Sequence, residues 1–176
     1  MTTQSAYFEA AVAYVIKNEG GGTYTDNPLD HGRGTRWGIT RATLDAWQSK
    51  KANPVRIQDL SRPNAESIYR AMYWEPLGLD RLESQAVATA LFDLSVMAGT
   101  HQATLIMQEC AGTKADGQLG PDSIRCINVN PPQALLPVFT SQAMAFLVRI
   151  ARRDATQRQF AAGWLCRVAK YVLLTL

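Results

Sequence analysis

Residues 5–24 read SAYFEAAVAYVIKNEGGGTY, an amphipathic segment that runs directly into three glycines. The glycines at 20–22 are strong helix terminators. Glu19 lies three, four and seven positions after Ile16, Val15 and Val12, so it extends the apolar stripe of the predicted helix. The full stripe has the spacing of one helical face and comprises Phe8, Val12, Val15 and Ile16.

This position predicts that Glu19 is a partly desolvated carboxyl group at the C-terminal end of a helix, beside an irregular loop. Desolvation raises the pKa of a carboxyl group, and the negative end of a helix dipole acts in the same direction. A general acid that donates a proton near neutral pH needs such an environment. The alternative is that Glu19 forms an ion pair with an arginine such as Arg36. Helix periodicity alone leaves both interpretations open.

The loop after Glu19 carries further polar candidates, namely Tyr24, Asp26, Asp30 and Thr35. An inverting glycosidase places a second group roughly 6.5–9.5 Å from its acid to orient water. An aspartate on a hairpin opposite the helix end can provide that gap, although both aspartates also occur in turn-forming contexts. Glycines at positions 32, 34 and 38 allow the backbone to turn tightly and to approach a sugar closely.

The rest of the chain predicts a mainly α-helical protein. Thr40 is the expected N-cap of a helix over 41–51, and Ser61 that of a helix with Pro63 in its first turn, which ends by Gly78. Residues 83–98 are apolar almost all round, as in a central buried helix that Gly99 closes. Further helices are expected to about residue 110, from Pro121, and over 132–153 and 157–173. We therefore expect one compact unit with a small loop or β-hairpin lobe at about 20–39.

Several motifs in this order resemble the signature of glycoside hydrolase family 108, a family of N-acetylmuramidases from phages and secretion loci. The similarity extends over nearly the whole chain. It rests on Glu19-Gly20-Gly21, Tyr24, Asn27-Pro28, Asp30, Gly32, Gly34-Thr35, Gly38-Ile39-Thr40, Phe92-Asp93, Ala98-Gly99, Lys114-Ala115-Asp116-Gly117-Gln118-Leu119-Gly120-Pro121, Gly163-Trp164-Leu165 and Arg167-Val168.

The resemblance implies a lysozyme-like fold and hydrolysis of the bond between N-acetylmuramic acid and N-acetylglucosamine, with Glu19 as the catalytic acid. By analogy with phage-type lysozymes, Asp30 and Thr35 would position the water. The resemblance also divides the chain into a catalytic region, 1–100, and a helical peptidoglycan-binding-like region, 101–176, packed into the same unit. It implies no metal or organic cofactor.

Other side chains extend the predicted substrate site. Tyr24, Asp26, Trp37, Tyr73 and Trp74 are candidates for sugar contacts, whereas Trp47 on its helix is expected in the core. Asp93, inside an apolar helix, is expected to be a structural hydrogen-bonding residue. A basic patch would meet anionic wall polymer or form a solvated helix face. It consists of Arg149, Arg152, Arg153 and Arg158.

Bulk properties narrow the function class. The chain has 176 residues, 47% of them hydrophobic and 19% charged, which is the composition of a globular domain without a stable membrane insertion. The formal charge of +3 favours anionic partners only mildly, and no segment has the features of a helix that reads nucleic-acid bases. The three cysteines, Cys110, Cys126 and Cys166, form no CxxC pair, so free thiols are expected and a zinc site is not.

Two departures from the family pattern leave a second hypothesis open. Gly22-Thr23 precede Tyr24, where an aromatic residue usually follows the glycine pair, and Arg33 stands where a second glycine is usual. The alternative is thus a non-catalytic peptidoglycan-binding or secretion-accessory module. The N-terminus shows no basic n-region of a secretory signal. We therefore expect action in the periplasm or cell wall after release through a holin-like membrane protein, with phage lysis and protein secretion both open.

Overall fold

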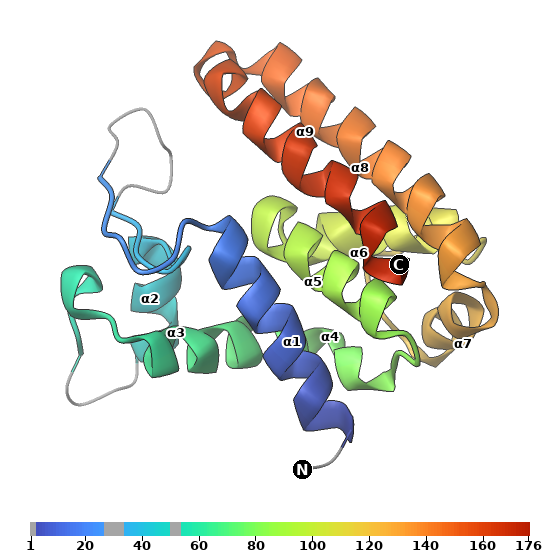
Figure 1. Ribbon diagram of the computed structural model, residues 1–176, viewed down its shortest axis with the longest axis horizontal. Coiled ribbons are helices and arrows are strands. Elements are labelled where there is room, and N and C mark those ends of the chain that lie inside the picture. Colours follow the sequence, from blue (N-terminus) through green and yellow to red (C-terminus); the bar gives the residue numbers. More distant parts are fainter. Residues whose placement is uncertain (1–2, 27–33, 50–53) are drawn as a thin grey trace.

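The computed structural model describes residues 3–26, 34–49 and 54–176 and shows a mainly α-helical protein (Figure 1). The first half contains α1 (Thr3–Asn18), α2 (Arg41–Gln48), η1 (Ile57–Asp59), α3 (Arg62–Tyr69), η2 (Arg70–Trp74), α4 (Glu75–Leu77), η3 (Leu79–Arg81) and α5 (Gln85–Ala98). The second half contains α6 (Thr100–Cys110), α7 (Pro121–Val129), α8 (Pro132–Arg153), η4 (Ala155–Phe160), α9 (Ala161–Ala169) and η5 (Lys170–Thr175). The predicted mainly α, lysozyme-like fold class is confirmed.

Side-chain caps explain where several helices begin. Thr40 accepts a hydrogen bond from the Thr43 amide at 3.2 Å, and Ser61 accepts one from the Asn64 amide at 3.3 Å. Ser84 caps α5 in the same way. Each cap satisfies an amide that has no partner within the first helical turn. The predicted caps Thr40 and Ser61 are confirmed.

The polypeptide between α3 and α4 forms a π-helical turn, η2. Ile68 and Tyr69 are fully buried, and the next fully buried residue is Trp74, five positions after Tyr69. One turn of π-helix accommodates five-residue spacing, which an α-helix does not. The turn therefore rotates Trp74 into the core and leaves Tyr73 half-buried.

The lobe after α1 holds two isolated antiparallel bridges within the described residues, Thr25 with Thr35 and Arg36 with Ile39. The Thr25 and Thr35 backbones exchange hydrogen bonds of 2.9 and 2.7 Å. This pairing brings residues 34–40 back towards the end of α1. The predicted loop lobe is thus present, and its central residues, including Asp30, lie outside the described part of the chain.

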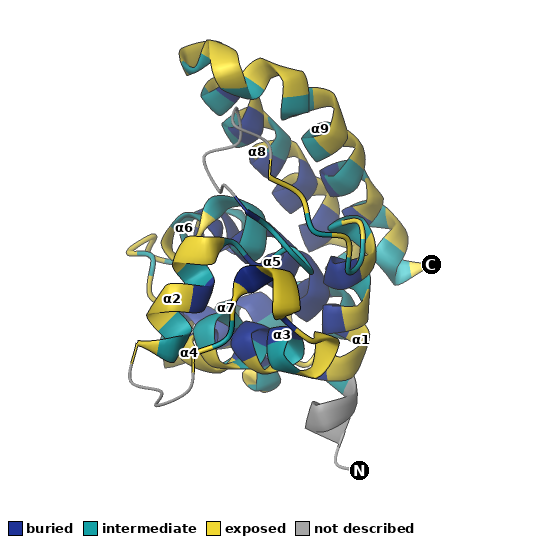
Figure 2. Ribbon diagram, turned by 90° about the vertical axis from the view of Figure 1, so that its left-hand side faces the viewer, coloured by how far each residue is buried: buried dark blue, intermediate teal, exposed yellow. Residues whose placement is uncertain are grey.

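The core surrounds α5, which contacts α1 on one side and α6, α8 and η5 on others. Figure 2 shows buried residues on the inner faces of these helices and exposed residues around the outside. α8 and α9 form a hairpin that returns the C-terminal segment to the body of the protein (Figure 1). The continuous helix expected over 157–173 is divided into η4, α9 and η5.

α8 is the one described helix that is long and apolar enough to cross a membrane by length and composition. It has 22 residues, and 39% of its most apolar 18-residue segment is buried within the protein. Its buried side chains include Leu136, Phe139 and Leu147, and it packs on α5, α6 and α9. These contacts give α8 one buried apolar face.

Candidate active site

Glu19 is positioned by the end of α1. Its amide donates to the Val15 carbonyl at 2.9 Å, so Glu19 continues the helical pattern. Gly20 and Gly21 then adopt φ values of 77° and 70°, and Gly21 donates back to the Ile16 carbonyl at 3.1 Å. Glycine closes helices in this way because it carries no Cβ. The Glu19 side chain is consequently held at a helix end and is 21% exposed, in agreement with the predicted partial desolvation.

The lobe closes over Glu19 through Gly38. A Cβ on Gly38 would overlap both the Glu19 side chain and the Tyr69 hydroxyl. Gly38 also has a φ of 74°, which other residues rarely adopt. The Tyr69 hydroxyl donates to the Trp37 carbonyl at 2.9 Å and so fixes this turn to α3. Both the backbone conformation and the close approach therefore require glycine here.

The opposite side of Glu19 is contacted by Arg167, from α9. Nη1 of Arg167 donates to Oε1 of Glu19. The other nitrogens of the guanidinium bind Asp93 on α5: Nε lies 3.1 and 2.9 Å from its two carboxylate oxygens, and Nη2 lies 2.8 Å from Oδ1. The Tyr171 hydroxyl donates to Oδ2 of Asp93 at 2.8 Å. Asp93 is fully buried, and these donors satisfy its charge, as its expected structural role requires.

The ion-pair alternative for Glu19 is thus half right. Glu19 does contact an arginine, but the partner is Arg167 and not Arg36, whose Nε donates to the Gly22 carbonyl at 3.0 Å. The contact with Arg167 involves one oxygen of the Glu19 carboxyl group, Oε1. Among the residues that the structure describes, Oε2 of Glu19 makes no hydrogen bond.

The electrostatics of this cluster keep its other members in fixed charge states. Burial alone would lower the pKa of Arg167, but Asp93 and Glu19 raise it above its ordinary value, so the guanidinium stays charged. Burial raises the pKa of Tyr69 well above its usual range, and the Glu19 charge adds to this. Burial also raises the pKa of Tyr73, against a hydrogen bond with Thr43 that lowers it. Both tyrosines therefore remain neutral near neutral pH.

Glu19 faces a cleft of about 270 Å³ between the lobe and the C-terminal hairpin. Thr35, Gly38 and Thr40 line it from the lobe side, and α5 contributes its C-terminal end. The remaining lining residues come from η4 and α9: Gln157, Trp164 and Arg167. Of the predicted catalytic residues, the structure brings Glu19 and Thr35 together in one cleft. Asp30 lies outside the described residues.

Three other predicted site residues, Tyr24, Asp26 and Trp37, make hydrogen bonds within the lobe or from the lobe to the segment before α3. Asp26 accepts from the Gly34 amide at 3.2 Å and from the Tyr24 hydroxyl at 3.3 Å, so it ties the two sides of the lobe together. The Trp37 indole donates to the Leu60 carbonyl at 2.9 Å. None of Tyr24, Asp26, Trp37 and Tyr73 lines the Glu19 cleft.

The prediction that Trp74 stacks on a sugar is wrong. Trp74 is fully buried, and its indole nitrogen donates to Asp80 at 2.8 Å. Its ring packs edge-on against Phe8 and Phe92, with centroid distances of 5.4 and 5.5 Å. Its neighbours Glu75 and Pro76 are exposed, but the π-helical turn directs Trp74 inward. Trp47, expected in the core, is instead half-buried at the edge of a surface hollow.

The C-terminal wall of the cleft was missed by sequence reasoning. Arg167 lies 148 positions from Glu19, and no local pattern connects them. A signal did exist, because Asp93 and Arg167 are opposite charges within two apolar helical segments. Buried charges are usually paired. Trp164 and Arg167 also stand in motifs of the family resemblance, but those motifs assigned them no site role, and Gln157 gave no signal.

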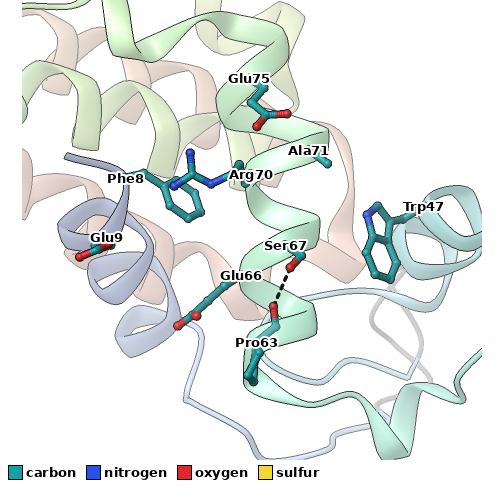
Figure 3. A pocket seen from close by; sticks show the side chains of 9 residues that line it. All are labelled: Phe8, Glu9, Trp47, Pro63, Glu66, Ser67, Arg70, Ala71 and Glu75. Atoms are coloured by element: carbon teal, nitrogen blue, oxygen red, sulfur yellow. Dashed lines mark hydrogen bonds between the residues drawn. The ribbon is translucent and has the colours of Figure 1, made fainter. Parts of the chain in front are cut away.

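A larger hollow, of about 580 Å³, lies between α1, α2 and the α3–α4 segment (Figure 3). Three glutamates line it, namely Glu9, Glu66 and Glu75. Glu66 pairs with Arg62 at 2.8 Å, and the Arg70 guanidinium lies over the Phe8 ring at 4.0 Å. Among the described residues, the hollow shares no lining residue with the Glu19 cleft.

Comparison with known proteins places this geometry in a family. The family model described as glycosyl hydrolase 108 matches residues 12–99, half of the chain. The chain belongs to the glycosyl hydrolase 108 family. A second family model, described as a predicted peptidoglycan domain, matches residues 102–169 of this glycosyl hydrolase 108 member. The chain is a glycosidase, and the second match links it to the peptidoglycan of the cell wall.

A solved structure supports the glycosyl hydrolase 108 assignment. The structure of Brucella abortus SagA is 28% identical in sequence, with a TM-score of 0.82. The similarity covers 96% of this chain and 93% of that chain. A comparison with curated proteins finds no match.

Proposed function

We propose that the protein is an N-acetylmuramidase that cleaves the bond from N-acetylmuramic acid to N-acetylglucosamine, with Glu19 as general acid. One observation carries this proposal. Among the described residues that line the cleft between the lobe and the C-terminal hairpin, Glu19 is the carboxyl group; Arg167 holds its Oε1, and its Oε2 makes no hydrogen bond to them. A carboxyl group held at one oxygen presents the other to the substrate in a defined direction.

The proposed reaction is a single displacement. Oε2 of Glu19 gives its proton to the glycosidic oxygen as the bond from that oxygen to the anomeric carbon breaks. A water molecule, positioned by Asp30 and Thr35, forms the new bond to the anomeric carbon and loses a proton to solvent, from which Glu19 is reprotonated. Thr35, which lines the cleft with Glu19, would orient this water through its hydroxyl.

The direct test is the Glu19→Gln variant, assayed on purified peptidoglycan by release of reducing sugars. Glutamine keeps the size of the side chain but its amide cannot transfer a proton to the leaving oxygen, so kcat should fall by about 10²–10⁴-fold. Glu75→Gln, an exposed carboxyl in the larger hollow, is the matched control and should keep wild-type kcat. Activity retained by a folded Glu19→Gln protein would refute the assignment of the acid.

The alternative of a non-catalytic wall-binding module rests on the Gly22-Thr23 insertion. Gly22 lies directly under the Trp37 ring, where a Cβ would overlap the ring atoms. The inserted Gly22 is therefore accommodated within the lobe, and Glu19 and Thr35 still line one cleft. Binding to peptidoglycan in a pull-down, without release of reducing sugars by the wild type, would favour the binding module.

The site of action and the route to it complete the proposal. The two family matches support action in the cell wall or periplasm. We further propose a holin-like membrane protein as the route of release, in phage lysis or in protein secretion. Co-expression with a holin should lyse bacterial cells, whereas expression of the enzyme alone should not. Equal lysis in both cases would argue against the holin route.

A further inference from the structure

We infer that the C-terminal region is half of the catalytic site, and that Arg167 is the positioning residue through which it orients Glu19. This inference rests on the proposed role of Glu19 as general acid. The region that contains Arg167 matches a predicted peptidoglycan domain, yet its contacts reach the centre of the cleft. The region would therefore contribute to turnover as well as to wall binding.

The first step of the argument is that Arg167 is itself immobilised. Its side chain is 12% exposed, and Asp93 holds it through two nitrogens, at 2.8–3.1 Å. A two-nitrogen contact with a carboxylate fixes the plane of the guanidinium. Tyr171 in turn fixes Asp93. Nη1 is the remaining donor group directed at Glu19, so its direction is set by buried contacts.

The second step is that the contact suits both protonation states of Glu19. Oε1 can accept from Nη1 whether Glu19 is ionised or protonated, because a protonated carboxyl keeps one carbonyl-type oxygen. The proton can then reside on Oε2. The ionised Glu19, Asp93 and Arg167 side chains carry a net charge of −1, and one proton on Glu19 makes the group neutral. The charge of Arg167 is thus shared between two carboxylates.

The third step is that Glu19 is held from two directions. The lobe contacts it through Gly38, and α9 contacts it through Arg167. Among the residues that the structure describes, the charged or titratable groups around Glu19 and its arginine partner are Arg167 from α9, Asp93 from α5, Tyr69 from α3, Tyr73 from η2, Tyr171 from η5 and Tyr14 from α1. Arg167 is the cation among these groups. Its removal should therefore change both the orientation of the acid and the ease with which it loses its proton.

The test compares kcat, KM and the pH–rate profile of the full chain with those of Arg167→Gln and Arg167→Lys. For Arg167→Gln we expect kcat to fall about 100-fold with KM nearly unchanged, because a small misplacement of a catalytic group has that effect. Loss of the cation should also move the alkaline limb of the profile to higher pH, because a nearby positive charge favours the ionised form of a carboxyl group.

Arg167→Lys separates charge from geometry. Lysine retains the cation but cannot form the two-nitrogen contact with Asp93. We therefore expect about a 10-fold loss in kcat, with the alkaline limb of the pH–rate profile at its wild-type position. A purely structural role would lower the folded fraction, measured by circular dichroism, without moving the limb. Arg56→Gln is the control and should behave as wild type, because this exposed arginine pairs with Asp59 and lines neither the cleft nor the hollow.

A folded Arg167→Gln protein with wild-type kcat and an unmoved alkaline limb would overturn the inference. If that variant does not fold, unchanged kcat in Arg167→Lys would overturn it instead. The wild type and Glu19→Gln are run in the same assay. An inactive wild type, or an active Glu19→Gln, would show that the proposed function has failed. A loss of kcat in Glu19→Gln without a loss of kcat in the Arg167 variants would refute this inference and leave the proposed function standing.

Discussion

The Glu19 cleft and the hollow between α1, α2 and α3 differ in how their charged side chains are held. The hollow is the larger, at about 580 Å³ against about 270 Å³. Its ion pair between Arg62 and Glu66 leaves these side chains 53% and 33% exposed. At the cleft, Arg167 is 12% exposed and holds Glu19, and Arg167 is itself held by Asp93, which is 0% exposed.

The difference shows that volume alone does not locate the site in this protein. A carboxyl group becomes a useful acid when its position and its neighbours are fixed before substrate arrives. The cleft meets this condition because segments from both halves of the chain converge on Glu19. The hollow lies between elements of the first half, and its Glu66 pair is open to solvent.

The largest difference between the two sites should appear in stability. Asp93→Ala leaves the Arg167 guanidinium in a buried position without its main partner, which should cost about 3–5 kcal/mol of the free energy of unfolding. Glu66→Ala breaks the partly exposed pair with Arg62 and should cost less than about 1 kcal/mol. Urea denaturation followed by circular dichroism measures both. Equal losses in the two variants would remove the distinction between the sites.

A smaller difference should appear in substrate binding. Trp164 lines the cleft, where its indole can contact a sugar face, so Trp164→Ala should lower kcat/KM about tenfold, mainly through KM. Trp47 lines the hollow, and Trp47→Ala should leave kcat/KM within about twofold of wild type. Steady-state assays on soluble peptidoglycan fragments provide the measurement. A larger loss for Trp47→Ala than for Trp164→Ala would move the substrate to the hollow.

The most gradual effect should be a loss of stability at alkaline pH that originates beside the cleft. Burial raises the pKa of Tyr171 well above the ordinary value of 10.0, and Asp93 adds to this; Tyr69 is raised in the same direction. A pKa raised in the folded state gives stability that is present below pH 10.0 and is lost as the pH rises above it, because the unfolded tyrosine ionises first.

The urea midpoint measured from pH 8 to pH 11 tests this expectation. Burial also raises the pKa of Cys110, from 9.0 to about 11, so a Cys110→Ser background separates its contribution. In that background, Tyr171→Phe should lose stability less steeply above pH 10, since phenylalanine has no proton to lose. Parallel pH dependences with and without Tyr171 would contradict the account.

Local features of the fold could be predicted from the sequence because they depend on neighbouring residues. Thr40 and Ser61 identify helix starts, and the apolar stripe through Val15 places Glu19 at the inward end of α1. Trp74 shows where such reasoning fails. A π-helical turn changes which face a residue occupies, and the spacing of apolar residues before it gives no sign of that change.

The half of the cleft around Glu19 was predictable to the extent that its residues are contiguous in the sequence. Glu19 and Thr35 lie within one short segment, and both line the cleft. The C-terminal half of the cleft was not predictable in this way, because Arg167 contacts Glu19 only through the packing of α9 on the rest of the protein. Contacts of that range depend on the whole fold. Asp93 was interpreted correctly as a structural residue, although its partner was not identified.

The most direct measurement of the central claim is mass analysis of the fragments that wild type and Glu19→Gln release from purified peptidoglycan. The account predicts that the wild type releases muropeptides that end in hydrated, reducing N-acetylmuramic acid, and that Glu19→Gln releases about 10²–10⁴-fold less of them. Fragments that end in N-acetylglucosamine, or the same products in equal amount from folded Glu19→Gln, would contradict it.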